Sequence, residues 1–122
     1  AIGTMVPVGL AAADLLADEG INVEVIDPRT LSPLDDATIK RSVARTRHLI
    51  VVHEAMSPCG PGAEIIARLA EDPCVEVAAR PVRITPPFAP SPFAPLLEQV
   101  YRPSADRVAQ TVRTLLERRL AA

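Results

Sequence analysis

The stretch HEAMSPCGPGAE gathers the side chains of this chain whose types and spacing could do chemistry. His53 and Glu54 end an apolar run, Cys59 precedes a Gly-Pro-Gly loop, and Gly62 and Glu64 lie where a helical pattern begins. Imidazole, carboxylate and thiol groups serve as general bases, nucleophiles and metal ligands. Backbone N–H groups at a glycine-rich helix start can hold an anion. The stretch therefore raises three possible chemistries: nucleophilic catalysis, metal binding and phosphate binding.

Each of these chemistries is weakly supported by the spacing. A dinucleotide fingerprint needs a third small residue where Ile65 stands, and the phosphate-binding pattern GxxxxGK does not occur. Ser57 is close to His53 but belongs to no GxSxG elbow. The metal-ligand types are reasonable, yet they follow no known spacing. Cys59 would be reactive only beside a helix N-terminus or a similar positive group. A strand-to-helix turn without catalysis is the simpler interpretation.

Alternating apolar patterns predict the elements that position this stretch. We expect helices at 5–18, 35–46, 62–71 and 104–120, and strands at 21–27, 48–54, 75–79 and 81–85. Such alternation favours an open α/β sheet with helices on both faces. Ligands of such sheets bind beyond the carboxyl ends of the strands, where His53 and Glu54 would lie. Residues 1–3 read as the end of a strand, so we expect the chain to be part of a longer polypeptide.

The helix ends and faces also carry predictions. Thr4 and Ser104 are expected to cap the first and last helices, because their hydroxyl groups can accept from the first free N–H groups. Gly20 is expected to end the first helix in the left-handed conformation. Leu10 and Leu16 are expected on the buried face of that helix.

The segment PPFAPSPFAP, residues 86–95, is too rich in proline for a helix or a central strand. It is predicted to be an extended, polyproline-like arm. One interpretation is a ligand for a polyproline-binding partner. The interpretation we favour is a stiff strap across the domain or onto a neighbouring subunit, with Phe88 and Phe93 as buried anchors.

Composition excludes several protein classes. The chain has 122 residues, of which 48% are hydrophobic, so we expect a single folded domain over residues 1–122. A net charge of −2 gives no electrostatic case for nucleic acid or an anionic membrane. No apolar run approaches the roughly 20 residues that a membrane span needs. Two cysteines without CxxC spacing form no disulfide framework, which favours a reducing, cytoplasmic setting.

Longer motifs carry a resemblance. GTMV, GINVEVIDPRTLSPLDDATIKRSVARTRHLIVVHEA, GPGAEIIARLAE and LLEQVYRPSADRV follow one another in this order. The chain thereby resembles the C-terminal domain of the beta subunit of thiamine diphosphate-dependent 2-oxoacid dehydrogenases, the pyruvate, branched-chain and acetoin enzymes. Transketolase and deoxyxylulose phosphate synthase share that fold but usually lack the pairing of VID-RTL-PLD with VVHEA, and they remain an alternative.

The resemblance implies a fold and a role. The fold is a three-layer α/β/α, Rossmann-like domain with an open, mostly parallel five-stranded sheet and one antiparallel strand. In the family, thiamine diphosphate and magnesium lie between the alpha subunit and the N-terminal domain of the beta subunit. The C-terminal domain then holds no catalytic, cofactor-binding or metal-binding residue. It joins subunits of an enzyme that oxidatively decarboxylates a 2-oxoacid and transfers the acyl group to lipoyl. Its expected partners are the alpha subunit, a second beta subunit and the dihydrolipoyl acyltransferase component.

The resemblance also assigns the residues of interest to structure or interfaces. The expected subunit-interface or crevice residues are His53, Glu54, Gly60, Gly62, Glu64, Phe88 and Phe93. The chain departs from the family pattern at Pro61, within a loop that commonly reads GGFG, and at Pro86 and Phe88, where Gly and Asp are common. Two alternatives remain: a free-standing anion- or partner-binding module of the same fold, and an esterase-like or thiol enzyme that uses His53 with Ser57 or Cys59.

Overall fold

A short parallel sheet lies at the centre of the structure, a computed structural model that describes residues 1–120. The elements in chain order are α1 (Met5–Ala17), α2 (Asp36–Thr46), β1 (Ile50–Val52), α3 (Pro61–Ala70), β2 (Val82–Ile84), α4 (Pro95–Tyr101) and α5 (Ala105–Leu120). β1 and β2 are parallel, with Ile50 opposite Val82 and Val52 opposite Ile84. Among the described residues, no helix combines the length and the apolar character that crossing a membrane requires.

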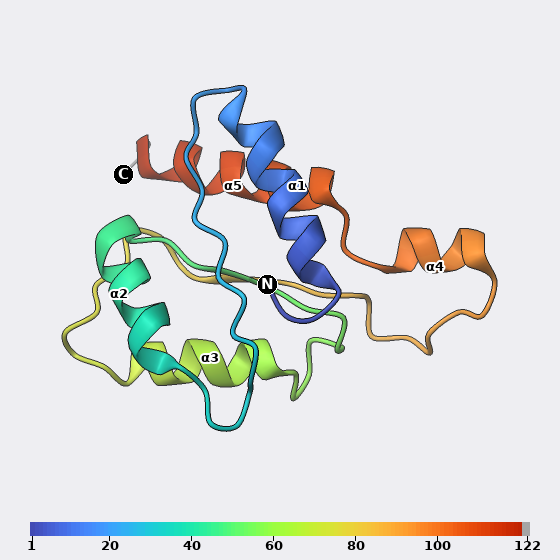
Figure 1. Cartoon of the computed structure of the whole chain (residues 1–122), viewed down its shortest axis with the longest axis horizontal. Helices are drawn as coiled ribbons and strands as arrows, with labels where there is room; N and C mark the ends of the chain where they lie inside the picture. Colours follow the sequence, from blue (N-terminus) through green and yellow to red (C-terminus); the bar gives the residue numbers. More distant parts are fainter. Residues whose placement is uncertain (121–122) are drawn as a thin grey trace.

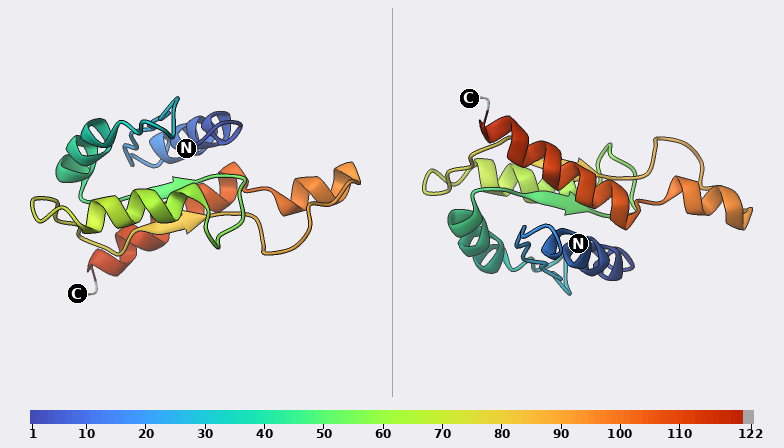
Figure 2. Two further views of the ribbon diagram at one scale, coloured as in Figure 1. Left: turned by 90° about the horizontal axis from the view of Figure 1, so that it is seen from below. Right: turned by 90° about the horizontal axis from the view of Figure 1, so that it is seen from above.

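The helices cover both faces of this sheet. In Figure 1 the sheet is seen nearly edge-on, with α1 and α5 on one side and α2 and α3 on the other. The views of Figure 2 place α3 and α5 on opposite faces of the two strands. The contacts of α1 with α5 and of α2 with α3 agree with this arrangement. The predicted α/β class with three layers is therefore confirmed.

The sheet divides the buried side chains into two clusters. Successive residues of a strand point to opposite faces, so Val51 and Val52 enter different clusters. Val52 and Ile84 pack with the α1 and α5 side chains Met5, Ala12, Leu16, Val108 and Ala109. Val51 packs with the α2 and α3 side chains Ile39, Val43, Ile65 and Leu69. β1 thus joins the two helical layers through alternate residues, whereas β2 packs against the α1 and α5 layer and its Arg83 is exposed.

The helix ends confirm most of the predicted caps. Ser104 Oγ accepts from the N–H of Arg107 at 3.2 Å, and Gly20 adopts a φ of 76° after α1. Thr4 was predicted to cap α1, which is wrong: it makes no side-chain cap hydrogen bond, and its hydroxyl donates to the Glu54 carboxylate instead. Leu16 is fully buried as expected, but Leu10 is 52% exposed and lies outside the buried face.

Two of the four predicted strand segments contain strands. β1 and β2 lie inside 48–54 and 81–85, while 21–27 and 75–79 are irregular. The described residues thus show two parallel strands, fewer than the five, one of them antiparallel, that the resemblance implies. A ladder needs a neighbouring strand about 4.8 Å away. An apolar cavity lies between 21–27 and β1 instead, so the β-branched residues of that segment have no ladder to join.

Up to Ala94 the proline-rich segment forms neither helix nor strand, as predicted, but it bends at 88–89 and 93–94 and is not one continuous extended arm; it then enters a helix that was not predicted. This helix, α4, has Pro95 in its first turn and no buried residue. Figure 1 shows α4 projecting away from the layers. Phe88 is 75% exposed and Phe93 is fully exposed, so the prediction that they are buried anchors across this domain is wrong.

Candidate functional site

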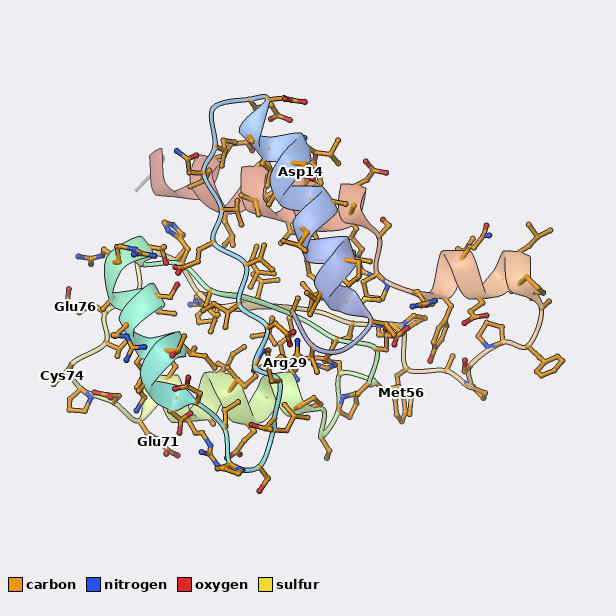
Figure 3. All side chains as sticks on the ribbon, in the orientation of Figure 1. Asp14, Arg29, Met56, Glu71, Cys74 and Glu76 are labelled. Atoms are coloured by element: carbon orange, nitrogen blue, oxygen red, sulfur yellow. The ribbon has the colours of Figure 1, made fainter. Side chains whose placement is uncertain are left out.

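The edge formed by the carboxyl ends of β1 and β2 brings part of the predicted site together. His53 follows β1 directly, and its backbone N–H donates to the carbonyl of Ile84 at 3.2 Å. Its side chain is 1% exposed. The loop that contains Met56 then leads to α3 (Figure 3). The strand therefore places His53 inside the protein, beneath the loop, rather than in an open crevice.

The imidazole of His53 takes part in the packing of α3. Its Nε2 accepts a hydrogen bond from the backbone N–H of Gly62 at 3.2 Å. Burial lowers the pKa of this imidazole, and the positive charge of Arg83 acts in the same direction. The ring is therefore neutral near pH 7, with its proton on Nδ1. A buried imidazole whose acceptor nitrogen is already used has no free lone pair for general-base catalysis.

Two glycines are needed because the His53 ring lies against the backbone. A Cβ atom added to Gly62 would stand 2.6 Å from His53 Nε2 and 3.2 Å from a methyl carbon of Val51. A Cβ atom added to Gly60 would stand 2.5 Å from the carbonyl oxygen of Met56 and 2.8 Å from His53 Cε1. Neither glycine has a positive φ. Space, rather than backbone conformation, therefore explains both glycines at this turn.

The start of α3 offers few donors to an anion. Pro61 is its first residue and has no N–H. The N–H of Gly62 bonds to His53, and the N–H of Ala63 bonds to the carbonyl of Gly60 at 2.9 Å. A pyrophosphate group needs several free N–H groups aimed at one point. The turn therefore does not fit the phosphates of a nucleotide or of thiamine diphosphate.

The cysteines and carboxylates do not assemble into a metal site. Residues 1–120 contain no group of three or more His, Cys, Asp or Glu side chains arranged to hold a metal ion. Cys59 is exposed in the left-handed conformation, with φ 56°, and Cys74 lies toward the other end of the molecule from the Met56 loop (Figure 3). Glu64 points to Arg68 on the surface of α3, at 2.7 Å, rather than to His53.

Glu54 joins three parts of the chain that are distant in sequence. Its carboxylate accepts from the hydroxyl of Thr4, just before α1, and its Oε1 lies 2.5 Å from Nε of Arg102, just after α4. Arg102 also lies 3.8 Å from Glu98 within α4. The ion pair at the carboxyl end of β1 therefore fixes the point where the chain returns from α4 to the layers.

Sequence reasoning missed the role of Arg102 and the apolar side chains of α4. Leu96, Leu97 and Val100 are 77%, 61% and 85% exposed. A signal for the helix was present, because Pro95 followed by Leu-Leu-Glu is typical of a helix start. The non-helical segment 86–94 and helix α4, which we call the arm (residues 86–101), carry the most exposed apolar side chains of the described chain.

One sequence family and several known proteins are similar to this chain. The sequence model described as "Transketolase, C-terminal domain" matches residues 1–108. The beta subunit of acetoin:2,6-dichlorophenolindophenol oxidoreductase from Cupriavidus necator is 42% identical over 115 residues, which are 94% of this chain and 34% of the relative. The beta subunit of the pyruvate dehydrogenase E1 component from Leifsonia xyli is 40% identical over 108 residues, 88% of this chain and 32% of the relative.

A solved structure supports the same likeness. A split gene transketolase, described as an inactive beta4 tetramer, superposes with a TM-score of 0.78 at 26% identity. The match covers 95% of this chain and 37% of that one. This chain thus spans about a third of the length of the curated relatives it matches.

Proposed function

The chain belongs to the transketolase C-terminal domain family, and from that membership we propose that it is the subunit-assembly domain of a 2-oxoacid dehydrogenase beta subunit. The parent enzyme decarboxylates a 2-oxoacid oxidatively and passes the acyl group to lipoyl. Support comes from the relatives of about 40% identity, which are named as beta subunits of acetoin and pyruvate enzymes. The partners under this proposal are the alpha subunit, a second beta subunit and the dihydrolipoyl acyltransferase component.

The observation that carries the proposal is the exposed apolar arm. Its large side chains Phe88, Phe93, Leu96, Leu97 and Val100 are all at least 61% exposed. A short helix without a buried face gains little stability from its own hydrogen bonds and depends on packing against another surface. Leu96 and Leu97 lie four and three positions before Val100, so the three side chains share one face of α4. Exposed apolar side chains gathered on one face mark interaction sites in soluble proteins. The arm therefore packs against an apolar surface of a neighbouring subunit.

The arm is held in position before any partner binds. The hydroxyl of Tyr101 donates to the carbonyl of Ala89 at 2.8 Å, which ties the end of α4 to segment 86–94. The Arg102–Glu54 ion pair fixes the base of the arm to the sheet. A preformed element loses less conformational entropy on binding than a flexible one, so more of its apolar contact contributes to assembly.

The cofactors then lie in other parts of the parent enzyme. Thiamine diphosphate and magnesium supply the decarboxylation chemistry there, and this domain contributes no ligand to them. The support is the turn before α3, where the Gly62 N–H is used by His53 and Pro61 has none to offer. His53, Gly60 and Gly62 then serve to pack α3 against the end of β1, which keeps Glu54 in place to hold the arm.

The experiment is a comparison of two leucine variants in the full-length beta subunit, co-expressed with its alpha subunit. Leu97→Ser removes an apolar side chain that is 61% exposed on the arm, and Leu10→Ser removes one that is 52% exposed on α1. Sedimentation velocity should show at least a tenfold weaker association for Leu97→Ser, with an unchanged melting temperature of the unassembled subunit. Leu10→Ser should assemble like the wild type. The proposal is contradicted if the Leu97→Ser variant and the double variant Leu97→Ser/Phe93→Ser both assemble like the wild type.

A further inference from the structure

The non-helical segment of the arm contains a serine for which the proposed function gives no role. In this chain four hydroxyl side chains stand directly before a proline: Ser32, Ser57, Thr85 and Ser91. A kinase that offers no acceptor to the N–H of the next residue selects proline at that position, because proline has no N–H to leave unpaired. The sequence alone therefore gives four candidate phosphorylation sites of equal standing.

Two of these hydroxyl groups are held in the folded part of the chain. Thr85 is 7% exposed, and its hydroxyl donates to the carbonyl of Pro86 at 3.1 Å. Ser57 is partly buried in the turn before α3, where its carbonyl accepts from the Arg83 guanidinium at 2.7 Å. A kinase must place the substrate hydroxyl against its catalytic aspartate, which requires a stretch of chain that can leave the surface. Neither Thr85 nor Ser57 lies in such a stretch.

Ser32 and Ser91 are both exposed, but the chain around them differs. The Thr30 hydroxyl donates to the carbonyl of Pro33 at 2.7 Å, so the loop folds back across Ser32. Residues 90–92 belong to no helix, strand or bend, and no hydrogen bond among the described residues involves them. Ser91 can therefore enter a kinase active site without the loss of any hydrogen bond of the fold.

The surroundings of Ser91 allow a kinase to approach and decide what a phosphate there would do. The arm projects away from the helical layers (Figure 1). On either side of Ser91, Phe88 is 75% exposed and Phe93 is fully exposed. A phosphoserine carries a charge of about −1.5 to −2 near pH 7. Phosphorylation would therefore place a strong negative charge between two aromatic side chains with which the arm is proposed to dock.

The arm has no cation that could neutralise this charge. Its charged side chain is Glu98, and residues 86–101 contain no Lys, Arg or His. Arg102, at the base of the arm, is already paired with Glu54 at 2.5 Å. A charged group that loses its hydration against an apolar surface is strongly destabilised unless an opposite charge or hydrogen-bond donors pair with it. A phosphate on Ser91 would therefore oppose docking of the arm.

We propose that Ser91 is a phosphorylation site and that its phosphate keeps the arm from docking. A proline-directed serine/threonine kinase transfers the γ-phosphoryl group of ATP to Ser91 Oγ; ADP leaves, and the hydroxyl proton passes to the catalytic aspartate of the kinase. Because a docked arm is covered by its partner, the modification acts on unassembled chains and keeps them unassembled. The effect on docking rests on the proposed function, whereas the modification itself rests on the exposure of Ser91 and the free backbone of residues 90–92.

Phosphate mapping tests the site. The unassembled full-length beta subunit is incubated with a recombinant proline-directed kinase, magnesium and ATP, and its peptides are analysed by mass spectrometry. The wild type should carry one phosphoryl group, on Ser91. The Ser91→Ala variant should take up none, whereas Ser57→Ala, the matched control, should be modified like the wild type. Absence of phosphate from Ser91, or comparable phosphate on Ser57, overturns the proposal.

Sedimentation velocity with the alpha subunit tests the effect on assembly. The phosphorylated wild type should associate at least about tenfold more weakly than the untreated protein, whereas kinase treatment should leave the association of Ser91→Ala unchanged. Ser91→Glu should associate more weakly than Ser91→Gln, which has the same size without the charge. If phosphate on Ser91 leaves association unchanged while Leu97→Ser weakens it, the proposed control is overturned and the assembly role stands. If Leu97→Ser also assembles normally, the assembly role fails as well.

Discussion

Replacement of Gly62 by alanine should destabilise the fold through a collision with one ring. The new Cβ would lie 2.6 Å from His53 Nε2 and 2.9 Å from Cδ2, and His53 is only 1% exposed. Overpacking of a buried site costs about 1–3 kcal/mol. Displacing the ring also weakens the Gly62 N–H to Nε2 hydrogen bond, worth about 1 kcal/mol. Alanine adopts the helical conformation more readily than glycine, which stabilises the variant by at most about 1 kcal/mol. The steric overlap therefore outweighs this gain, and the free energy of unfolding should fall by about 2 kcal/mol.

A double-mutant cycle isolates the ring as the cause. Urea unfolding followed by circular dichroism gives the free energy of unfolding for Gly62→Ala alone and in a His53→Ala background. Without the imidazole the added methyl group has room, so the loss should fall to within about 0.5 kcal/mol of zero. Gly60→Ala is the control, because its Cβ would stand 2.5 Å from the Met56 carbonyl and should remain destabilising in both backgrounds. An equal cost of Gly62→Ala in the two backgrounds would refute the reasoning.

Two further predictions concern titration and helix capping. Because burial lowers the folded-state pKa of His53, the unfolded chain binds the extra proton first, so stability should decrease as the pH falls through about 6.5 and below. His53→Gln should remove that part of the pH dependence, measured by urea unfolding at each pH; a slope that survives in this variant would assign the effect to another group. Asp35 accepts from the N–H of Thr38 at 3.0 Å at the start of α2. Asp35→Ala should therefore lower the free energy of unfolding by about 1 kcal/mol. Asp35→Asn should lower it much less, because its amide oxygen can still accept from the Thr38 N–H. Equal losses of stability in the two variants would rule out capping as the cause.

Local sequence signals predicted four of the five described helices and missed α4, because those four carry clear evidence in their own residues. α2 shows this: an acidic start at Asp35 and Asp36 and buried positions at Ile39 and Val43 both appear in the structure. Strands depend on neighbours as well as on their own residues. The β-branched segment 21–27 has strand-like composition, yet without a partner in the adjacent cavity it forms no ladder. Composition therefore located an extended apolar segment but could not decide its pairing.

The candidate site, like the fold, could be predicted from the sequence only in part. Proximity in sequence correctly placed His53, Gly60 and Gly62 at one turn. It could not show that the ring is buried under α3, because this depends on the path of the loop around Met56. The Glu54–Arg102 ion pair joins residues far apart in sequence, and a single sequence carries no signal for it. Leu10 was misplaced because the apolar pattern of α1 extends beyond the face that α5 covers.

The exposed arm has a consequence for the life of the chain in a cell. Until a neighbour covers Phe93, Leu96 and Val100, the newly made chain presents the kind of apolar surface that chaperones bind and that promotes aggregation. Under the proposed assembly role, proteases would also act on unassembled chains of this kind, so an excess of the chain over its partners would be removed rather than stored. Under that role the arm would couple the abundance of the chain to the supply of its partners.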